Sequence, residues 1–362
     1  MSAGERYQSR PAAKALESTP VQVQPLDVHD DQALQDYQQV SAEAESCGRE
    51  YPTEWQLSEM TATLRRENTG VELEPFAAVA DGRIVGAGLL EIPSMDNPHL
   101  AILEVVVAPP VRGQGIGSAL VDYAVRRTTE LGRRSVVAEV NVPLHADEAH
   151  PYSRFAARHG FTRRLVELHQ VMDYPSPPDL LAELEQGCAA HCRDYRLVSW
   201  GDHCPDEYVE QFCALLAAMG DHAPPASWTW KPRRWDFERL RDTEARRIDQ
   251  GRRSYTTVAV MMDGSLAGYT QLGVPTHDPL RIFQWDTLVL PVHRGHRLGM
   301  ALKLANLKRA QAEHRDPRVL HTWNAEGNEP MLAVNGQLGF HPVERVEEWQ
   351  LDLRGDASAV VG

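Results

Sequence analysis

The same residue pattern occurs twice in this sequence, far apart along the chain. Residues 289–299 repeat the Val-x-Pro-x-x-Arg-Gly-x-x-x-Gly spacing of residues 107–117, 182 positions later. The same offset separates two Asp-Gly pairs, at 81–82 and 263–264. A chance match between short motifs would not keep its register over such a span. The sequence therefore predicts two copies of one domain, and 362 residues are enough for each copy to bury its own core.

Linker and strand signals set the expected boundaries of the two copies. Residues 174–178 are rich in proline, which lacks a backbone donor and is typical of a linker. We expect, in chain order, a mobile tail at 1–20, a first domain at 21–174, a linker with a short helix at 175–193, a second domain at 194–354 and a tail at 355–362. Apolar patterns predict strands at 100–107 and 135–142 around a helix at 118–131. A strand at 162–174 is expected to close the first domain.

Residues 104–118 run from an apolar strand, through a loop with three glycines, into a helix. Gly113, Gly115 and Gly117 allow a sharp turn and leave backbone amides uncovered. Such amides at a helix N-terminus form an anion site suited to a pyrophosphate. The loop lacks the lysine of a nucleotide P-loop and the Gly-x-Gly-x-x-Gly spacing of a dinucleotide-binding loop. A glycine-rich connection without a ligand is the remaining alternative.

At this loop the sequence resembles the GNAT superfamily of acyl-CoA-dependent acyltransferases. The pyrophosphate motif of that family, Gln/Arg-x-x-Gly-x-Gly/Ala, is matched by Arg112, Gly115 and Gly117. The resemblance implies an α/β class with a mixed (α+β) sheet and two tandem GNAT-fold domains. The run Asn324, Asn328, Met331 and Asn335 is similar to the C-terminal half of actinobacterial tandem acyltransferases of the mycothiol-synthase type.

The resemblance also implies where acetyl-CoA, or another acyl-CoA, would bind as co-substrate. The backbone of Val105, Val106 and Val107 would hold the pantetheine arm. The other implied cofactor-binding residues are Arg112, Gly113, Gln114, Gly115, Ile116, Gly117 and Ser118 in the first copy, and Val289, Arg294, Gly295, His296, Arg297, Gly299, Asn324 and Asn328 in the second. Arg297 replaces the glycine found at 115, so we expect the first loop to be the firmer site.

The implied reaction is direct attack of an unprotonated amine on the thioester in a ternary complex, which needs a base and usually an acid. Glu104 and its counterpart Asp286 are the candidate bases, since each is a carboxylate in an apolar strand. The alternative is that each is a strand-end carboxylate paired with an arginine. The family's acid is a tyrosine, but Ala156 and Asn335 stand at the two matching positions. Tyr152, one helical turn earlier, is a candidate replacement.

Composition limits the possible partners. A net charge of −14 argues against nucleic acid or anionic lipid and is compatible with a cationic small-molecule amine as acceptor. The sequence shows neither an apolar run long enough to span a membrane nor a hydrophobic signal core, so we expect a cytoplasmic N-acetyltransferase. Five cysteines in no zinc-finger spacing predict reduced thiols and no metal. Alternatives are a non-catalytic acyl-CoA-binding or sensing protein with degenerate domains, and an interaction module.

Overall fold

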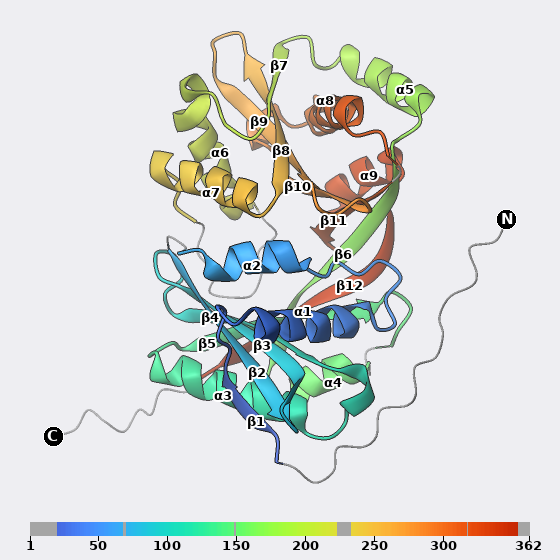
Figure 1. Ribbon diagram of the computed structural model, residues 1–362. Coiled ribbons are helices and arrows are strands. Elements are labelled where there is room, and N and C mark those ends of the chain that lie inside the picture. Colours follow the sequence, from blue (N-terminus) through green and yellow to red (C-terminus); the bar gives the residue numbers. More distant parts are fainter. Residues whose placement is uncertain (1–19, 68–69, 148–149, 223–232, 317, 354–362) are drawn as a thin grey trace.

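The computed structural model describes residues 20–67, 70–147, 150–222, 233–316 and 318–353. Within these residues, 12 strands form one mixed sheet with helices on both faces (Figure 1). The strands are β1 (Gln22–Pro25), β2 (Val71–Ala80), β3 (Arg83–Pro93), β4 (Leu100–Val107), β5 (Ser135–Pro143), β6 (Thr162–Tyr174), β7 (Tyr195–Trp200), β8 (Arg252–Met261), β9 (Leu266–Pro275), β10 (Arg281–Val289), β11 (Arg318–Ala325) and β12 (His341–Asp352). The α/β class and the predicted strands are confirmed.

The helices alternate with these strands in the same order in both copies. They are α1 (Asp31–Ser46), α2 (Leu57–Arg65), α3 (Ile116–Glu130), α4 (Pro151–Arg158), α5 (Pro178–Ala189), α6 (Val209–His222), α7 (Phe237–Asp249), α8 (Leu298–Glu313) and α9 (Glu329–Leu338), with short 3-10 turns η1 (Pro109–Val111), η2 (Asp206–Tyr208) and η3 (Pro291–His293). Helix α5 lies in the expected linker and carries the chain from β6 to β7.

The strand order is palindromic with respect to the two copies: β1-β2-β3-β4-β5-β12-β6-β11-β10-β9-β8-β7. The last strands are exchanged, because β12 pairs with β5 and β6 pairs with β11. The strand at 162–174 was expected to close the first domain, and this expectation is wrong. Both strands that pair with β6, β11 and β12, come from the second copy. Its apolar pattern identifies a strand but does not specify which edge it joins. The domain boundaries at 174 and 194 stay a prediction.

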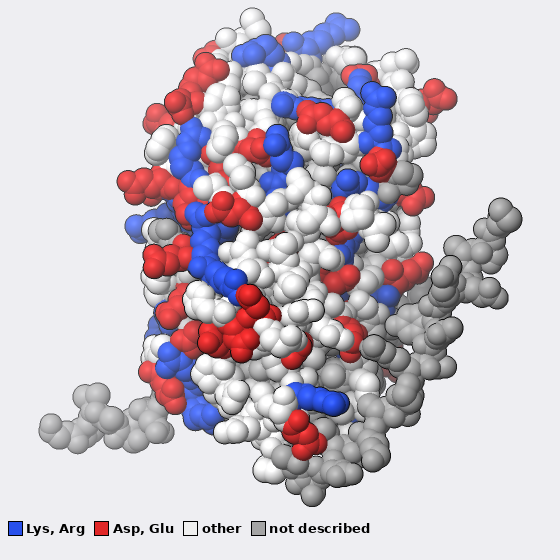
Figure 2. All heavy atoms as spheres, in the orientation of Figure 1, with Lys and Arg blue, Asp and Glu red and all other residues white. Residues whose placement is uncertain are grey.

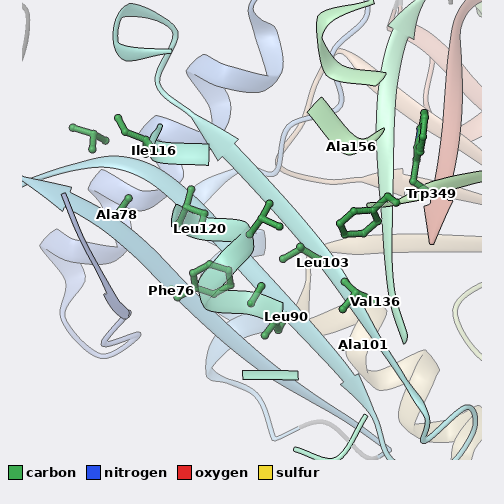
Figure 3. Close-up of a cluster of buried hydrophobic side chains, with 14 of the residues drawn as sticks. Phe76, Ala78, Leu90, Ala101, Leu103, Ile116, Leu120, Val136, Ala156 and Trp349 are labelled. Carbon is green, nitrogen blue, oxygen red and sulfur yellow. The ribbon is translucent and has the colours of Figure 1, made fainter. Parts of the chain in front are cut away.

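The exchanged strands also complete each other's cores. Trp349 of β12 packs in the cluster built by β2 to β5 and α3, whereas Met172 and Tyr174 of β6 pack in the cluster under α8. Figure 3 shows the first of these clusters, in which side chains such as Phe76 and Leu120 fill the space between the sheet and α3. Each half therefore depends on a strand from the other.

Helices cover both faces of each half. In the first half, α1 and α2 pack on one face and α3 and α4 on the other. In the second half, α6 and α7 pack on the face that corresponds to that of α1 and α2. Helix α8, with α5 beside it, packs on the opposite face. Helices α2 and α7 therefore meet where the halves join (Figure 1), and Arg66 after α2 forms ion pairs with Asp242 and Asp249 of α7.

Surface charge on the face drawn in Figure 2 is mixed, with acidic and basic side chains scattered between uncharged ones. None of the helices in the described part of the chain is long and apolar enough to cross a membrane. Across the same residues there is no group of three or more side chains suited to hold a metal ion.

Candidate active site

The first glycine loop follows β4 and leads through η1 into α3. Gly113 and Gly115 have φ angles of 78° and 85°, a region in which glycine carries no steric cost. A Cβ atom at either residue would meet no atom within 4 Å, so the loop backbone is open on that side. Arg112 braces the loop, since its Nε donates to the Val107 carbonyl over 3.1 Å and its Nη2 to the Ala44 carbonyl over 3.1 Å. The backbone of residues 113–115, directly before α3, is thus exposed, and Arg112 braces it.

Strands β4 and β5 separate directly below this loop. Their parallel pairing runs from Leu100 with Ser135 to Leu103 with Ala138 and ends there. Residues 104–107 still pair with β3 but have no β5 partner, so one edge of their backbone is unpaired within the sheet. An unpaired strand edge offers donors and acceptors to an extended ligand. The gap between β4 and β5 leads from the glycine loop toward Glu104.

A cavity of about 490 Å³ adjoins this unpaired edge, and we name it the β4 cleft. Its walls come mainly from α1, α2 and the segment before it, β3, β4 and β5, with single residues of β11, β12 and the segment before α7. Five carboxylates line it: Glu45, Glu54, Glu91, Glu104 and Glu139. Val105 and Val106 also line it, so two of the predicted pantetheine residues reach the same space as the candidate base.

Glu104 is the most perturbed carboxylate of the β4 cleft. Desolvation, followed by the charges of Glu91, Glu139 and Glu45, raises its pKa from 4.5 to about 8. The side chain nevertheless remains accessible through the cleft, so it is a carboxylate at the bottom of a cavity and not one packed in a core. Among the described residues no arginine pairs with Glu104, which goes against the alternative of a strand-end ion pair.

The tyrosines near this site differ from the expectation. The Tyr152 hydroxyl accepts a hydrogen bond from Arg112 Nη1 over 2.6 Å, and Tyr152 does not line the β4 cleft. Ala156 is packed in the core behind the sheet. Tyr37 does line the cleft, and its hydroxyl donates to the Gly88 carbonyl over 2.7 Å. Tyr37 is not among the residues predicted from the sequence, and nothing in the sequence links it to Glu104.

The second glycine loop keeps the geometry of the first, but the linker contacts it. Arg294 Nε donates to the Val289 carbonyl over 3.2 Å, as Arg112 does in the first copy. Arg297 has a φ of 53°, and its Nη1 donates to the Gly187 carbonyl of α5 over 3.2 Å. The Cys192 thiol donates to the His296 carbonyl over 3.2 Å. The linker therefore occupies one side of this loop, where the first loop is open.

A second cavity of about 580 Å³ lies beside β10, and we name it the β10 cleft. Asp286 lines it and accepts a hydrogen bond from the Tyr269 hydroxyl over 3.4 Å. Burial raises the pKa of Asp286, although the charge of Arg247 opposes that rise. Asn324 and Asn328 line this cleft too, so the structure brings these three predicted residues together.

A buried polar chain forms the wall of the β10 cleft behind these residues. Lys303 Nζ donates to Asn335 Oδ1 over 2.8 Å, and Asn335 Nδ2 donates to Gln170 Oε1 over 2.9 Å. Lys303 lines the cleft, and burial lowers its pKa from 10.5 to about 7. Lys303 is not among the residues predicted from the sequence. A comparison of the two copies would reveal it, because a lysine at 303 replaces an apolar residue of the first copy. The equivalent position in α3, 182 residues earlier, is the core residue Val121.

Comparison with known proteins agrees with this architecture. A sequence profile of the acetyltransferase (GNAT) family matches residues 40–161. The structure of a tandem GNAT protein from the clavulanic acid biosynthesis pathway is similar to this chain with a TM-score of 0.77 and 30% identity, over 93% of this chain and 99% of that one. The chain belongs to the GNAT acetyltransferase family and is of the tandem type.

Two more distant structures share the fold alone. A GCN5-related N-acetyltransferase from Sphaerobacter thermophilus is 15% identical with a TM-score of 0.61, over 92% of this chain and 96% of that one. Saccharomyces cerevisiae N-myristoyltransferase with bound myristoyl-CoA is 12% identical with a TM-score of 0.55, over 96% of this chain and 82% of that one. A search of curated protein sequences gave no significant match. The closer resemblance to the mycothiol-synthase type stays a prediction.

Proposed function

We propose that this protein transfers an acetyl group from acetyl-CoA to the amine of a small molecule, by direct attack within a ternary complex in the β4 cleft. The observation that carries this proposal is the convergence of three features of the first copy. These are a glycine loop with open amides, a strand edge without a partner below it, and an unpaired carboxylate where that edge begins.

The first copy's own residues fit an acyl-CoA. The amides around Gly113 and Gly115 would receive the pyrophosphate, and the unpaired edge at 105–107 would receive the pantetheine arm. The thioester supplies the activated acyl group. The loop of the second copy is a weaker candidate, because α5 and Cys192 contact it.

Glu104 is the proposed base. A carboxylate with a pKa of about 8 can accept a proton near neutral pH, and removing a proton from the ammonium makes the amine nucleophilic. Carboxylates around it also attract a cationic acceptor into the cleft. The arrangement suits proton removal from a bound ammonium beside the strand edge.

The missing family tyrosine favours a second candidate function. Ala156 lies in the core and Tyr152 is held by Arg112, so neither presents an acid to the β4 cleft. A protein with an intact cofactor loop but no tyrosine at the family's acid position is the pattern expected of a non-catalytic acyl-CoA-binding or sensing protein. Tight acetyl-CoA binding without acetyl transfer to any of a broad set of small primary amines would favour that function.

Glu104→Gln tests the proposed role of Glu104. We expect kcat to fall by about 100-fold or more, the contribution typical of a general base, with acetyl-CoA affinity unchanged. The rise of kcat/KM with pH toward about 8 should also disappear. Glu130→Gln is the matched control, since Glu130 lies on the outer side of α3. Wild-type kinetics in Glu104→Gln would remove Glu104 from the mechanism.

A further inference from the structure

The β10 cleft contains more positive than negative side chains. Its cations are Arg233, Arg246, Arg247, Arg252 and Lys303, and its carboxylates are Glu91, Glu167 and Asp286. Burial and the charge of Glu139 raise the pKa of Glu167 to about 7, so this carboxylate is only partly ionised at neutral pH. Lys303, whose pKa is also about 7, is likewise only partly charged, but four arginines face three carboxyl groups, so the cleft holds an excess of positive charge.

Three of these cations have no carboxylate partner. Arg252 forms an ion pair with Glu59, but Arg246 and Arg247 make neither an ion pair nor a side-chain hydrogen bond with any residue that the structure describes. Lys303 bonds only to the neutral amide of Asn335. Lys303 is buried, whereas Arg246 and Arg247 are partly exposed in the cleft. Buried cations are normally paired, so the surroundings of Lys303 lack a negative group, and the two arginines are available to a ligand.

Arg247 is held in position by its surroundings. Its guanidinium lies 4.2 Å from the centre of the Trp285 ring, which is within the range of a cation–π contact. The indole lies against Gly273, where a Cβ atom would come within 2.2 Å of it. A planar guanidinium stacked in this way keeps its donors free for a carboxylate or a phosphate.

The cations are destabilised as long as no anion is present. Burial lowers the pKa of Arg247, Asp286 opposes this shift and the neighbouring Arg246 adds to it, and together these effects place the pKa at about 10. Burial alone lowers the pKa of Lys303 to about 7. A bound anion would reverse these shifts, so anion binding and protonation of Lys303 are coupled.

The neighbouring β4 cleft is lined mainly by carboxyl groups, with Arg233 as its one cation among the described residues. Trp55, Glu91, Arg233 and Trp323 line both clefts, so the two cavities adjoin. The β4 cleft has two carboxylates, Glu104 and Glu139, without a cation partner among the described residues. One ligand that reaches both cavities would therefore meet mainly carboxyl groups at one end and mainly guanidinium groups at the other.

We propose that the β10 cleft binds the anionic group, a carboxylate or a phosphate, of the same small molecule whose amine reacts beside Glu104, so that the acceptor is a zwitterion. The position of the reacting amine rests on the function proposed above. The anion site itself rests only on the cations of the β10 cleft.

The first test compares three primary amines with the same five-carbon chain: pentylamine, cadaverine and aminovalerate. We expect aminovalerate to have the highest kcat/KM. Arg247→Met should lower that value about tenfold or more, as expected for the loss of a charge-assisted bond, and leave pentylamine unchanged. Arg253→Met, at an exposed arginine paired with Asp202, is the matched control. Preference for cadaverine or pentylamine in the wild type would overturn the proposal, although the enzyme function would stand.

The second test measures binding without catalysis. Inorganic phosphate should raise the melting temperature of the wild type and of Arg253→Met more than that of Arg247→Met or Lys303→Met, because phosphate can also bind at the first glycine loop in every variant. An equal rise in all four proteins would overturn the anion site. If no amine is acetylated, stabilisation by phosphate still supports the anion site, and only the proposed acetyltransferase function would be wrong. No stabilisation of the wild type would overturn the anion site. Weaker acetyl-CoA binding in Arg247→Met, with amine preference unchanged, would assign the anion to the acyl donor and also overturn the proposal.

Discussion

The ion pair between Arg49 and Glu344 links the two halves, and its removal has a calculable effect. Arg49 follows α1, and Glu344 lies on the exchanged strand β12. Arg49 Nε and Nη2 each donate to a Glu344 carboxylate oxygen over 2.8 Å, and His169 Nδ1 lies 3.2 Å from the same carboxylate. The two charged side chains are 9% and 7% exposed.

The pKa of Glu344 gives the magnitude. Burial alone would raise this pKa, but the hydrogen bonds from His169 and Arg49 and the charge of Arg49 hold it at about 2, below the usual 4.5. Because the pKa of Glu344 is lower in the folded than in the unfolded protein, its ionised carboxylate stabilises the fold at pH values above 4.5. That stabilisation is lost as the pH falls toward 2. The shift corresponds to roughly 3 kcal/mol at pH 7 and about 1.5 kcal/mol at pH 3. Removing one partner of a buried ion pair costs about 3–5 kcal/mol of stability. Without Glu344, Arg49 still forms its ion pair with Glu45, so we expect a loss of about 3 kcal/mol.

We therefore expect Glu344→Gln to lower the free energy of unfolding by about 3 kcal/mol at pH 7 and by about half of that at pH 3. Urea unfolding at the two pH values measures both differences, provided that wild type and variant have the same m value. Glu43→Gln, at an exposed residue of α1, should change stability by less than about 0.5 kcal/mol. A loss below about 1 kcal/mol, or a loss that does not depend on pH, would refute the reasoning.

Two further predictions concern the clefts. Because the pKa of Glu104 is raised from 4.5 to about 8, ionisation destabilises the fold as pH rises through that range, so Glu104→Gln should raise the melting temperature more at pH 9 than at pH 5. Equal gains at both pH values would contradict the shift. Gly273→Ala should lower the free energy of unfolding by about 1–3 kcal/mol because its Cβ would overlap Trp285, whereas Gly336→Ala, with open space in α9, should raise it by about 0.5–1 kcal/mol. Denaturant unfolding measures both changes, and a neutral Gly273→Ala would show that the indole can move aside.

The repeat and the glycine loops were predictable because they depend on local residue patterns. Gly113 and Gly115 adopt positive φ angles where the sequence predicted a sharp turn, and the strand at 100–107 has the predicted bounds. The exchange of β6 and β12 was not predictable, because the side-chain pattern of a strand specifies its faces but not its neighbours.

The site was predictable only where one copy could be aligned on the other. Glu104 and Asp286 were found from their equivalent positions, and both line cavities. Tyr37 and Arg247 reach those cavities from helices distant in the sequence, so only the fold brings them there. Tyr152 was a plausible acid by spacing along its helix, but its hydrogen bond with Arg112 depends on tertiary structure.

The most direct test of the proposed acyl-CoA site is a calorimetric titration of acetyl-CoA into the wild type, Gln114→Glu and Gln114→Met. Gln114 is exposed between Gly113 and Gly115, so a carboxylate there repels a pyrophosphate without disturbing the fold, and methionine is the neutral control. The first-loop assignment predicts binding to the wild type with one firm site per chain, similar affinity in Gln114→Met and at least about tenfold weaker binding in Gln114→Glu. Equal affinity in all three proteins, or no binding to the wild type, would contradict it.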